Sequence, residues 1–122
     1  MGLLFLGLSL ASCKKEQTFD DKLSGTWKSS KVTYDNKDQT SVTDYTLVLQ
    51  PSKEFDFTKT ALLGGSTIRT GIWETNEARQ EIILRYDDST ESERYDISGL
   101  DAKFMIAETI LDGKRLEIEF KK

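Results

Sequence analysis

The sequence contains no histidine, and only one cysteine and one proline, among its 122 residues. Without histidine the chain cannot assemble a Ser-His-Asp or Cys-His catalytic group, or bind a metal ion through imidazole. A single cysteine cannot form a disulfide bond within the chain. Glycine-rich loops of the phosphate-binding or dinucleotide-binding type are also missing. We therefore expect a protein that is not an enzyme and that has no cofactor or metal centre.

The acidic residues could in principle supply a pair of catalytic carboxylates or a calcium site. The 21 Asp and Glu residues include many pairs of the kind that glycosidases use, but most lie in predicted loops or on polar strand faces. Simple solvation explains their charge there. Oxygen ligands suited to calcium are offered by Asp35, Asp38, Asp87 and Asp88, although their spacing matches no known calcium loop. We adopt neither possibility.

Positive charge is too scattered for a nucleic-acid partner. The chain carries 17 Lys and Arg against 21 Asp and Glu, a net charge of −4, whereas binding to a phosphate backbone requires clustered basic residues. A composition of 37% hydrophobic and 31% charged residues is typical of a soluble globular domain. We expect that domain to be a monomer.

Long hydrophobic runs are absent apart from a short one at the N-terminus, Leu3 to Leu10. This run is too short to span a bilayer, which takes about 20 residues, but it suits the core of a cleaved secretory signal. It leads into Leu10-Ala11-Ser12-Cys13, which resembles the lipobox of bacterial lipoproteins. The alternative is a buried N-terminal strand whose cysteine is an ordinary core residue.

The lipobox resemblance implies three segments. Residues 1–12 would be a lipoprotein signal peptide, and residues 13–22 would be the lipidated Cys13 followed by a polar, flexible tether. Residues 23–122 would form the folded domain. Each buried methylene contributes about 0.8 kcal/mol, so two or three acyl chains on Cys13 would hold the protein on the membrane. The resemblance implies a lipid anchor in the outer membrane, on either its periplasmic face or the cell surface.

From Leu23 onward, apolar and polar residues alternate with a period of two, which predicts β-strands. The last strand is the clearest example, because Leu116, Ile118 and Phe120 share one face. Turn signals such as Gly64-Gly65 and Asp112-Gly113 separate the strands. The other apolar residues predicted to share inward faces are Val32, Tyr34, Tyr45, Leu47, Leu49, Phe55, Phe57, Ile82, Leu84, Tyr86, Tyr95, Ile97, Phe104 and Ile106.

About eight short strands with short connections predict an all-β fold in which neighbours are antiparallel. Each strand has one apolar face to bury, and closing the sheet into a barrel buries it while also removing the exposed edges. We therefore expect an eight-stranded up-and-down barrel, closed or half-open. A two-sheet sandwich is the alternative.

Two Gly-x-Trp motifs stand out, Gly25-Thr26-Trp27 and Gly71-Ile72-Trp73. Glycine lets a neighbouring group approach the backbone closely, and tryptophan covers a large apolar area. The simplest role for both tryptophans is to fill the core at a barrel end.

The segments 23–28, 71–73 and 113–120 together resemble lipocalins and the smaller lipocalin-like lipoproteins of Gram-negative bacteria. In lipocalins a basic side chain covers the tryptophan of the first strand, which implies that Trp27 stacks with Arg115 or Lys114. Fatty-acid-binding proteins differ, because they insert two helices after the first strand and carry an Arg-x-Tyr pair that this chain lacks.

The resemblance implies that the barrel binds a small hydrophobic ligand. Its predicted lining residues are Tyr34, Tyr45, Phe55, Phe57, Trp73, Leu84, Tyr86 and Phe104. The alternative is a dry, packed core in a structural or interaction module that contacts an envelope protein or glycan through loops 35–44 and 87–93. A continuous cavity of about 300 Å³ or more would favour ligand binding, and a filled barrel would favour the interaction module.

Overall fold

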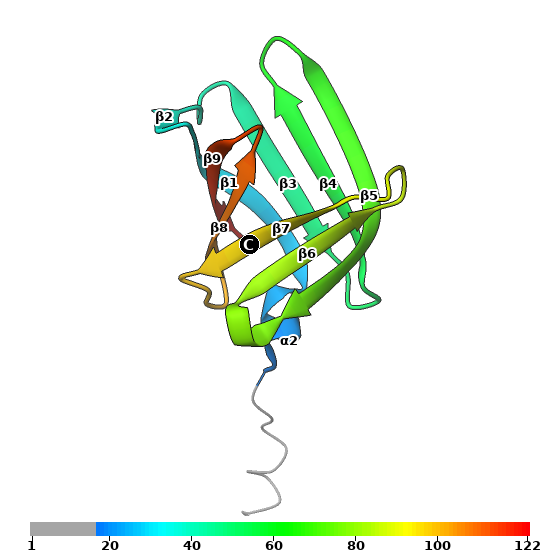
Figure 1. Ribbon diagram of the computed structural model, residues 1–122. Coiled ribbons are helices and arrows are strands. Elements are labelled where there is room, and N and C mark those ends of the chain that lie inside the picture. Colours follow the sequence, from blue (N-terminus) through cyan, green and yellow to red (C-terminus); the bar gives the residue numbers. More distant parts are fainter. Residues whose placement is uncertain (1–16) are drawn as a thin grey trace, which may run out of the picture.

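The computed structural model in Figure 1 describes residues 17–122, so the predicted signal peptide and Cys13 lie outside the described residues. Eight strands form one antiparallel sheet that closes on itself. In chain order they are β1 (Gly25–Tyr34), β3 (Thr43–Leu49), β4 (Glu54–Ala61), β5 (Gly65–Asn76), β6 (Glu81–Tyr86), β7 (Ser92–Ser98), β8 (Phe104–Leu111) and β9 (Lys114–Lys121).

Three short elements accompany the barrel. Strand β2 (Lys37–Asp38) pairs only with the end of β1, and the 3-10 helix η1 (Glu77–Arg79) joins β5 to β6. Helix α2 (Phe19–Leu23) precedes β1. Within residues 17–122 no helix is long and apolar enough to cross a membrane.

Pairing of the first and last barrel strands closes the sheet, with Val32 opposite Ile118. This contact confirms the predicted up-and-down barrel and excludes the sandwich. The shortest pairing between neighbouring barrel strands is that of β7 with β8. These strands share three residue pairs, Asp96–Glu108, Ile97–Ala107 and Ser98–Ile106, whereas β8 and β9 share eight.

Hairpin turns follow the local sequence signals. Asp112 and Gly113 have φ of 53° and 76°, and Asp35 and Asn36 have φ of 55° and 63°. Two consecutive residues with positive φ form the turn type whose twist matches that of the flanking strands. These turns therefore hold β8 against β9, and β1 against β2.

The period-two pattern predicts the inward face of most strands. Tyr45, Leu47 and Leu49 on β3 are buried, as are Phe55 and Phe57 on β4. Burial of these apolar side chains on one face of a curved sheet provides the main stabilisation of the barrel. The largest fully buried side chains are Trp27, Trp73, Phe55 and Phe120.

Strand β8 departs from the prediction, which placed Phe104 and Ile106 on the inward face. Met105 and Ala107 are the buried residues, with 0% and 2% of their surface exposed, and the Phe104 ring lies against Gly99. Each of the two alternating sets on this strand contains three apolar residues and one polar residue, so the pattern does not decide between them. Register decides, because Met105 pairs with the inward Phe120 of β9, and a shift by one residue exchanges the faces.

The N-terminal boundary of the domain also needs correction, because residues 19–22 of the predicted tether are helical. Thr18 caps α2 by accepting a hydrogen bond from the Asp21 amide, and the Asp21 side chain bonds the Thr18 amide in return. Phe19 and Leu23 are buried in the core. The folded domain therefore includes residues 18–22, which the sequence assigned to the tether, since a helix of five residues is too short to show a helical period.

Candidate functional site

One end of the barrel is closed by α2 and the two tryptophans. The Trp27 indole N–H donates a hydrogen bond to the Leu23 carbonyl at 2.7 Å, and the Trp73 indole N–H donates one to the Gln50 carbonyl at 2.9 Å. Both rings are fully buried. Their polar atoms are therefore satisfied by backbone while their rings fill the barrel end, as the sequence predicts.

A basic side chain covers Trp27, but it is Lys122 and not Arg115 or Lys114. The Lys122 amino group lies 4.9 Å from the centre of the Trp27 ring. Strand β9 runs antiparallel to β1, so its last residues lie beside the start of β1 and Lys121 pairs with Lys28. Arg115 lies at the opposite end of β9, where it forms an ion pair with Glu108 at 2.5 Å.

The glycines of both motifs allow close approach, as predicted. A Cβ atom on Gly71 would lie 1.9 Å from the Arg85 carbonyl oxygen of β6. A Cβ atom on Gly25 would lie 2.5 Å from the Lys122 side chain, and Gly25 has a φ of +138°. Gly25 thus leaves the space through which Lys122 crosses to reach Trp27.

The middle of the barrel is filled by side chains. An internal void of about 10 Å³ remains there, which is about the size that holds one water molecule. It is lined by Leu47, Phe57, Ile82, Leu84, Tyr95, Ala107 and Phe120.

The end opposite α2 is open and contains two adjoining hollows of about 220 and 230 Å³. Both are lined by Tyr45, Lys59, Leu111 and Leu116, and we refer to the two hollows together as the basin. The first is completed by Val32, Tyr34, Gln39, Thr43 and Asp112. The second is completed by Phe57, Thr67, Arg69, Tyr86, Glu93 and Tyr95.

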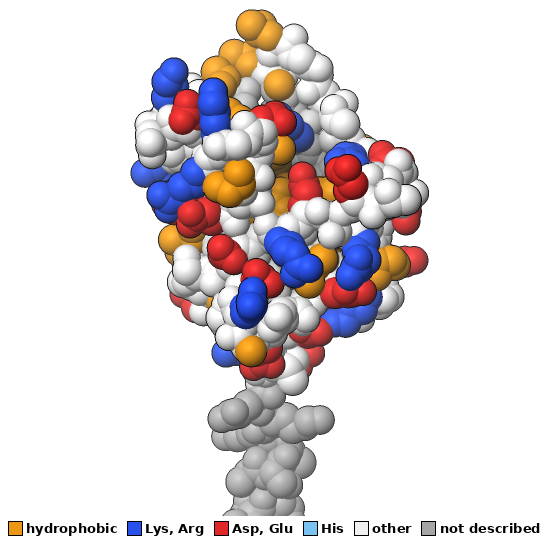
Figure 2. All heavy atoms as spheres, viewed as in Figure 1, with side chains coloured by type: hydrophobic (Ala, Val, Ile, Leu, Met, Phe, Trp, Pro, Cys, Tyr) orange, Lys and Arg blue, Asp and Glu red, His pale blue; other side chains and the backbone are white. Residues whose placement is uncertain are grey.

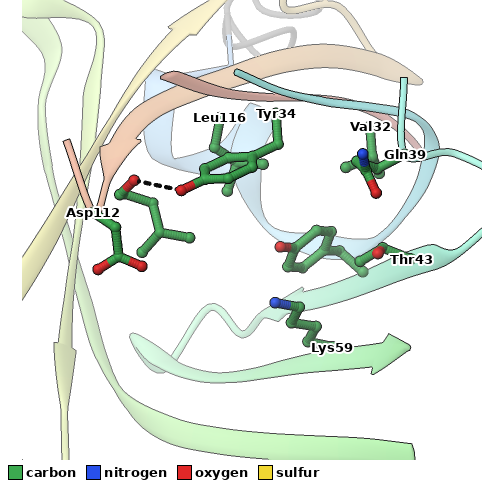
Figure 3. A pocket seen from close by; sticks show the side chains of 9 residues that line it. Val32, Tyr34, Gln39, Thr43, Lys59, Asp112 and Leu116 are labelled. Carbon is green, nitrogen blue, oxygen red and sulfur yellow. Dashed lines mark hydrogen bonds between the residues drawn. The ribbon is translucent and has the colours of Figure 1, made fainter. Parts of the chain in front are cut away.

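The first hollow combines an apolar wall with polar side chains. Figure 3 shows Tyr34 and Leu116 on one side, and Lys59 directed into the space below them. The Tyr34 hydroxyl donates a hydrogen bond to the Leu111 carbonyl at 3.0 Å. This bond ties the end of β1 to the end of β8 across the basin wall.

The second hollow is aromatic and contains one carboxylate. Phe57 packs against Tyr45 and Tyr95, with ring centres 5.5 and 6.1 Å apart. Glu93 accepts hydrogen bonds from the hydroxyls of Tyr86 and Tyr95, the latter at 3.1 Å. Burial and the Glu93 charge raise the pKa of both tyrosines, so both remain protonated donors at neutral pH.

Arg69 covers one side of the second hollow but is already paired. Its guanidinium lies 3.6 Å from the centre of the Tyr86 ring and donates a hydrogen bond to Asp88 at 2.9 Å. This hydrogen bond raises the pKa of Arg69 and lowers that of Asp88. The positive charge of Arg69 is therefore neutralised at the rim.

Comparison with known proteins finds a likeness in three-dimensional structure. No family model matches the chain, and no curated protein matches its sequence. Among solved structures, a lipocalin-like protein from Bacteroides uniformis superposes with a TM-score of 0.58 over 83% of this chain and 98% of that one. The fold is lipocalin-like. With 15% sequence identity, the likeness shows the fold alone.

The lipocalin-like barrel brings half of the predicted lining residues together. Tyr34, Tyr45, Phe57 and Tyr86 line the basin. The other four do not, since Phe55, Trp73 and Leu84 are buried in the packed part of the barrel and Phe104 faces outward.

Polar basin residues were missed at the sequence level, although the pattern contains a signal for them. Alternation continues one step beyond the apolar residues towards the open end of each strand. It places Thr43 on the face of Tyr45, and Lys59 on the face of Phe57. On the same argument Glu93 shares the face of Tyr95. Polar residues at these inward positions are expected where a barrel mouth meets water.

The aspartates considered as calcium ligands lie in two separate turns and have protein partners. Asp35 forms an ion pair with Lys114 at 3.7 Å, and Asp87 accepts a hydrogen bond from Thr70 at 2.8 Å. In the part of the chain from residue 17 onward, no group of three or more acidic, cysteine or histidine side chains is arranged to hold a metal ion.

Charges of both signs are mixed over the face shown in Figure 2. Hydrophobic side chains gather at the upper tip of that view, where the β4–β5 hairpin exposes Leu62 and Leu63 with 69% and 97% of their surface free. This tip lies at the same end of the barrel as the basin, because Lys59 and Thr67, which pair with each other next to the hairpin, line the second hollow.

Proposed function

We propose that the protein is a lipoprotein, anchored to the outer membrane through Cys13, whose lipocalin-like barrel binds a small hydrophobic molecule in the basin. The observation that carries the binding role is the contrast between the two barrel ends. One end is sealed by Trp27 and Trp73, and the other retains the basin. Binding, rather than catalysis, is the role that this arrangement supports.

The walls of the basin favour an apolar body. Leu111 and Leu116 line both hollows, and the rings of Tyr45 and Phe57 border the second. Removing apolar surface from water stabilises a complex by about 25 cal/mol per Å². Each hollow alone is smaller than the roughly 300 Å³ of a typical ligand site, so the ligand is compact or occupies both.

The position of the N-terminal segment is compatible with anchoring. The described chain enters the barrel through α2 at the sealed end, opposite the basin (Figure 1). In this proposal the lipid on Cys13 keeps the protein at the membrane, and the basin binds the ligand.

Native mass spectrometry of the full-length Cys13→Ala protein tests the binding role without detergent. We expect a small-molecule mass excess that is lost on organic extraction. Leu111→Trp should fill the basin and abolish the excess, because Leu111 lines both hollows. Ile110→Trp is the matched control, since the neighbouring Ile110 is 66% exposed and lines neither hollow.

A bare chain mass, also after incubation with a panel of apolar compounds, would contradict the binding role. The alternative of an interaction module acting through loops 35–44 and 87–93 would then be favoured. An equal mass excess in Leu111→Trp and Ile110→Trp would place the bound molecule elsewhere and overturn the assignment to the basin.

A further inference from the structure

Four side chains around the first hollow can donate hydrogen bonds to a ligand. They are the Lys59 ammonium, the Gln39 amide, and the hydroxyls of Thr43 and Tyr45. Within residues 17–122, none of these four groups makes a hydrogen bond or an ion pair. Lys59 is exposed, and Gln39 and Thr43 are half-buried, so water reaches these donors in the free protein and a ligand that enters the hollow can replace that water.

Tyr45 and Lys59 form the centre of this group. They are direct partners across β3 and β4, so their side chains lie on the same face of the sheet. The Lys59 amino group lies 6.0 Å from the centre of the Tyr45 ring. Tyr45 is only 7% exposed and lines both hollows, which gives its hydroxyl access to any basin ligand.

Gln39 and Thr43 complete the group from the neighbouring segment. Figure 3 shows both on the wall above Lys59, with Asp112 on the far side of the hollow. The Thr43 amide donates a hydrogen bond to the Gln39 carbonyl at 3.0 Å, so the backbone holds these two residues together. Their side chains remain available to a ligand.

Lys59 differs from the other cation of the basin in having no carboxylate partner. Arg69 is paired with Asp88, whereas no ion pair of Lys59 is formed within residues 17–122. Glu93 lines the second hollow together with Lys59 but forms no ion pair with it, and its carboxylate accepts hydrogen bonds from Tyr86 and Tyr95. Asp112 lies on the far side of the first hollow from Lys59 (Figure 3). An ammonium beside an apolar wall is suited to an anionic ligand group.

We propose that the basin takes a compact amphiphile whose anionic group pairs with Lys59 and accepts hydrogen bonds from Thr43 and Tyr45. Gln39 supplies a further donor at the edge. The apolar body of the ligand packs on Val32 and Leu116. This assignment rests on the binding role proposed above and adds the chemical class of the ligand.

Two features of the basin support this class. Burial raises the pKa of Tyr45, so its hydroxyl stays protonated and donates at neutral pH. The filled middle of the barrel, with its void of about 10 Å³, leaves no channel for a long acyl chain. A short or planar apolar body is therefore accommodated, and a long chain has to remain outside the mouth.

Isothermal titration calorimetry with 2-naphthoate and its uncharged counterpart 2-acetylnaphthalene separates the charge from the apolar body. We use the full-length Cys13→Ala protein as the parent and add Lys59→Met, Lys59→Arg and Lys28→Met. Lys28 is the control, because it is exposed on β1 and lines neither hollow. The parent should bind the anion about tenfold or more tightly than the neutral compound, as expected for a charge-assisted contact.

Lys59→Met should abolish this preference, Lys59→Arg should keep part of it, and Lys28→Met should keep all of it. Equal binding of both compounds to the parent would overturn the anionic class and leave the binding role standing. A preference that survives Lys59→Met would likewise overturn the assignment to Lys59. Binding of neither compound, together with a bare mass in the preceding experiment, would overturn the binding role itself.

Discussion

At the scale of single residues, the Gly-x-Trp motifs show how a missing side chain sets packing. Gly71 brings the β6 backbone close to β5, and Gly25 lets Lys122 reach the ring of Trp27. In both motifs the tryptophan two residues later is fully buried. The motif therefore combines a glycine that leaves room for a close contact with a tryptophan whose ring fills the adjacent end of the barrel.

Substitution of Gly71 by alanine should destabilise the protein strongly. The added Cβ would lie 1.9 Å from the Arg85 carbonyl oxygen and 2.9 Å from the Phe55 ring, so the backbone of β5 or β6 has to move. We expect a loss of about 3 kcal/mol or more, at the upper end of overpacking effects. Urea unfolding should show a lower midpoint with an unchanged slope.

Gly64→Ala is the matched control for this prediction. Its Cβ would meet only Ala61 at 3.4 Å, an ordinary contact, and we expect a change within about 0.5 kcal/mol. Equal unfolding midpoints for Gly71→Ala and Gly64→Ala would show that the β5–β6 approach is not limiting.

Residue-level prediction from the sequence was good where one alternating set of a strand is apolar and the other polar. It assigned Tyr45 and Phe57 correctly to the inward face. It failed at Phe104, because both alternating sets of β8 are mostly apolar and only the pairing with β9 distinguishes them. It also overlooked Lys59, whose inward position follows from the same alternation.

At the scale of elements, helix α2 is held against the barrel by polar contacts as well as by Phe19 and Leu23. Asp20 accepts hydrogen bonds from Lys53 and from Thr75, the latter at 2.5 Å. Lys53 also lies 4.2 Å from the centre of the Trp73 ring. One short helix therefore links the start of β4 and the end of β5 at the sealed end.

The pH dependence of stability should report this link. Burial opposes ionisation of Asp20, but the hydrogen bonds from Lys53 and Thr75 and the Lys53 charge outweigh it, and the pKa of Asp20 is lowered. A lowered folded-state pKa stabilises the fold above the unfolded value of about 3.9, and this stabilisation disappears as the pH falls through the folded-state pKa.

Asp20→Asn should therefore melt at a lower temperature than the parent near neutral pH, at about pH 7. The difference should shrink as the pH is lowered from about 7 towards about 2, because protonation of Asp20 removes the charge that pairs with Lys53. Thermal unfolding followed by circular dichroism measures it. A melting-temperature difference that is the same at both pH values would rule out the ionised Asp20–Lys53 contact as the cause.

At the scale of the whole molecule, the two barrel ends have different roles. The end that carries α2 is sealed by apolar side chains, and the other carries the basin, where the donors around Lys59 have no partner in the part of the chain from residue 17 onward. A single sheet with no exposed edge over most of its length supports both ends rigidly. Helix α2, the first element of the described chain, and the proposed ligand site therefore lie at opposite ends of the barrel.

Replacement of the predicted lipidation site should change where the protein is found. Cys13→Ala should move it from the membrane fraction to the soluble fraction, because the acyl chains supply the binding energy to the bilayer. Fractionation of cells followed by immunoblotting measures the shift, with Lys28→Met as a control that leaves the lipobox intact. Unchanged membrane association of Cys13→Ala would refute the lipoprotein assignment.

The sequence by itself determined the fold class, the number of barrel strands and most of the turns. Period-two alternation and paired turn residues such as Asp112-Gly113 involve residues close together in the sequence, so they can be recognised without a structure. Long-range pairing decided the rest. Which face of β8 is buried, which lysine covers Trp27, and where Lys59 meets Tyr45 all depend on register. Register is set by strands far apart in the chain, and a local pattern does not contain it.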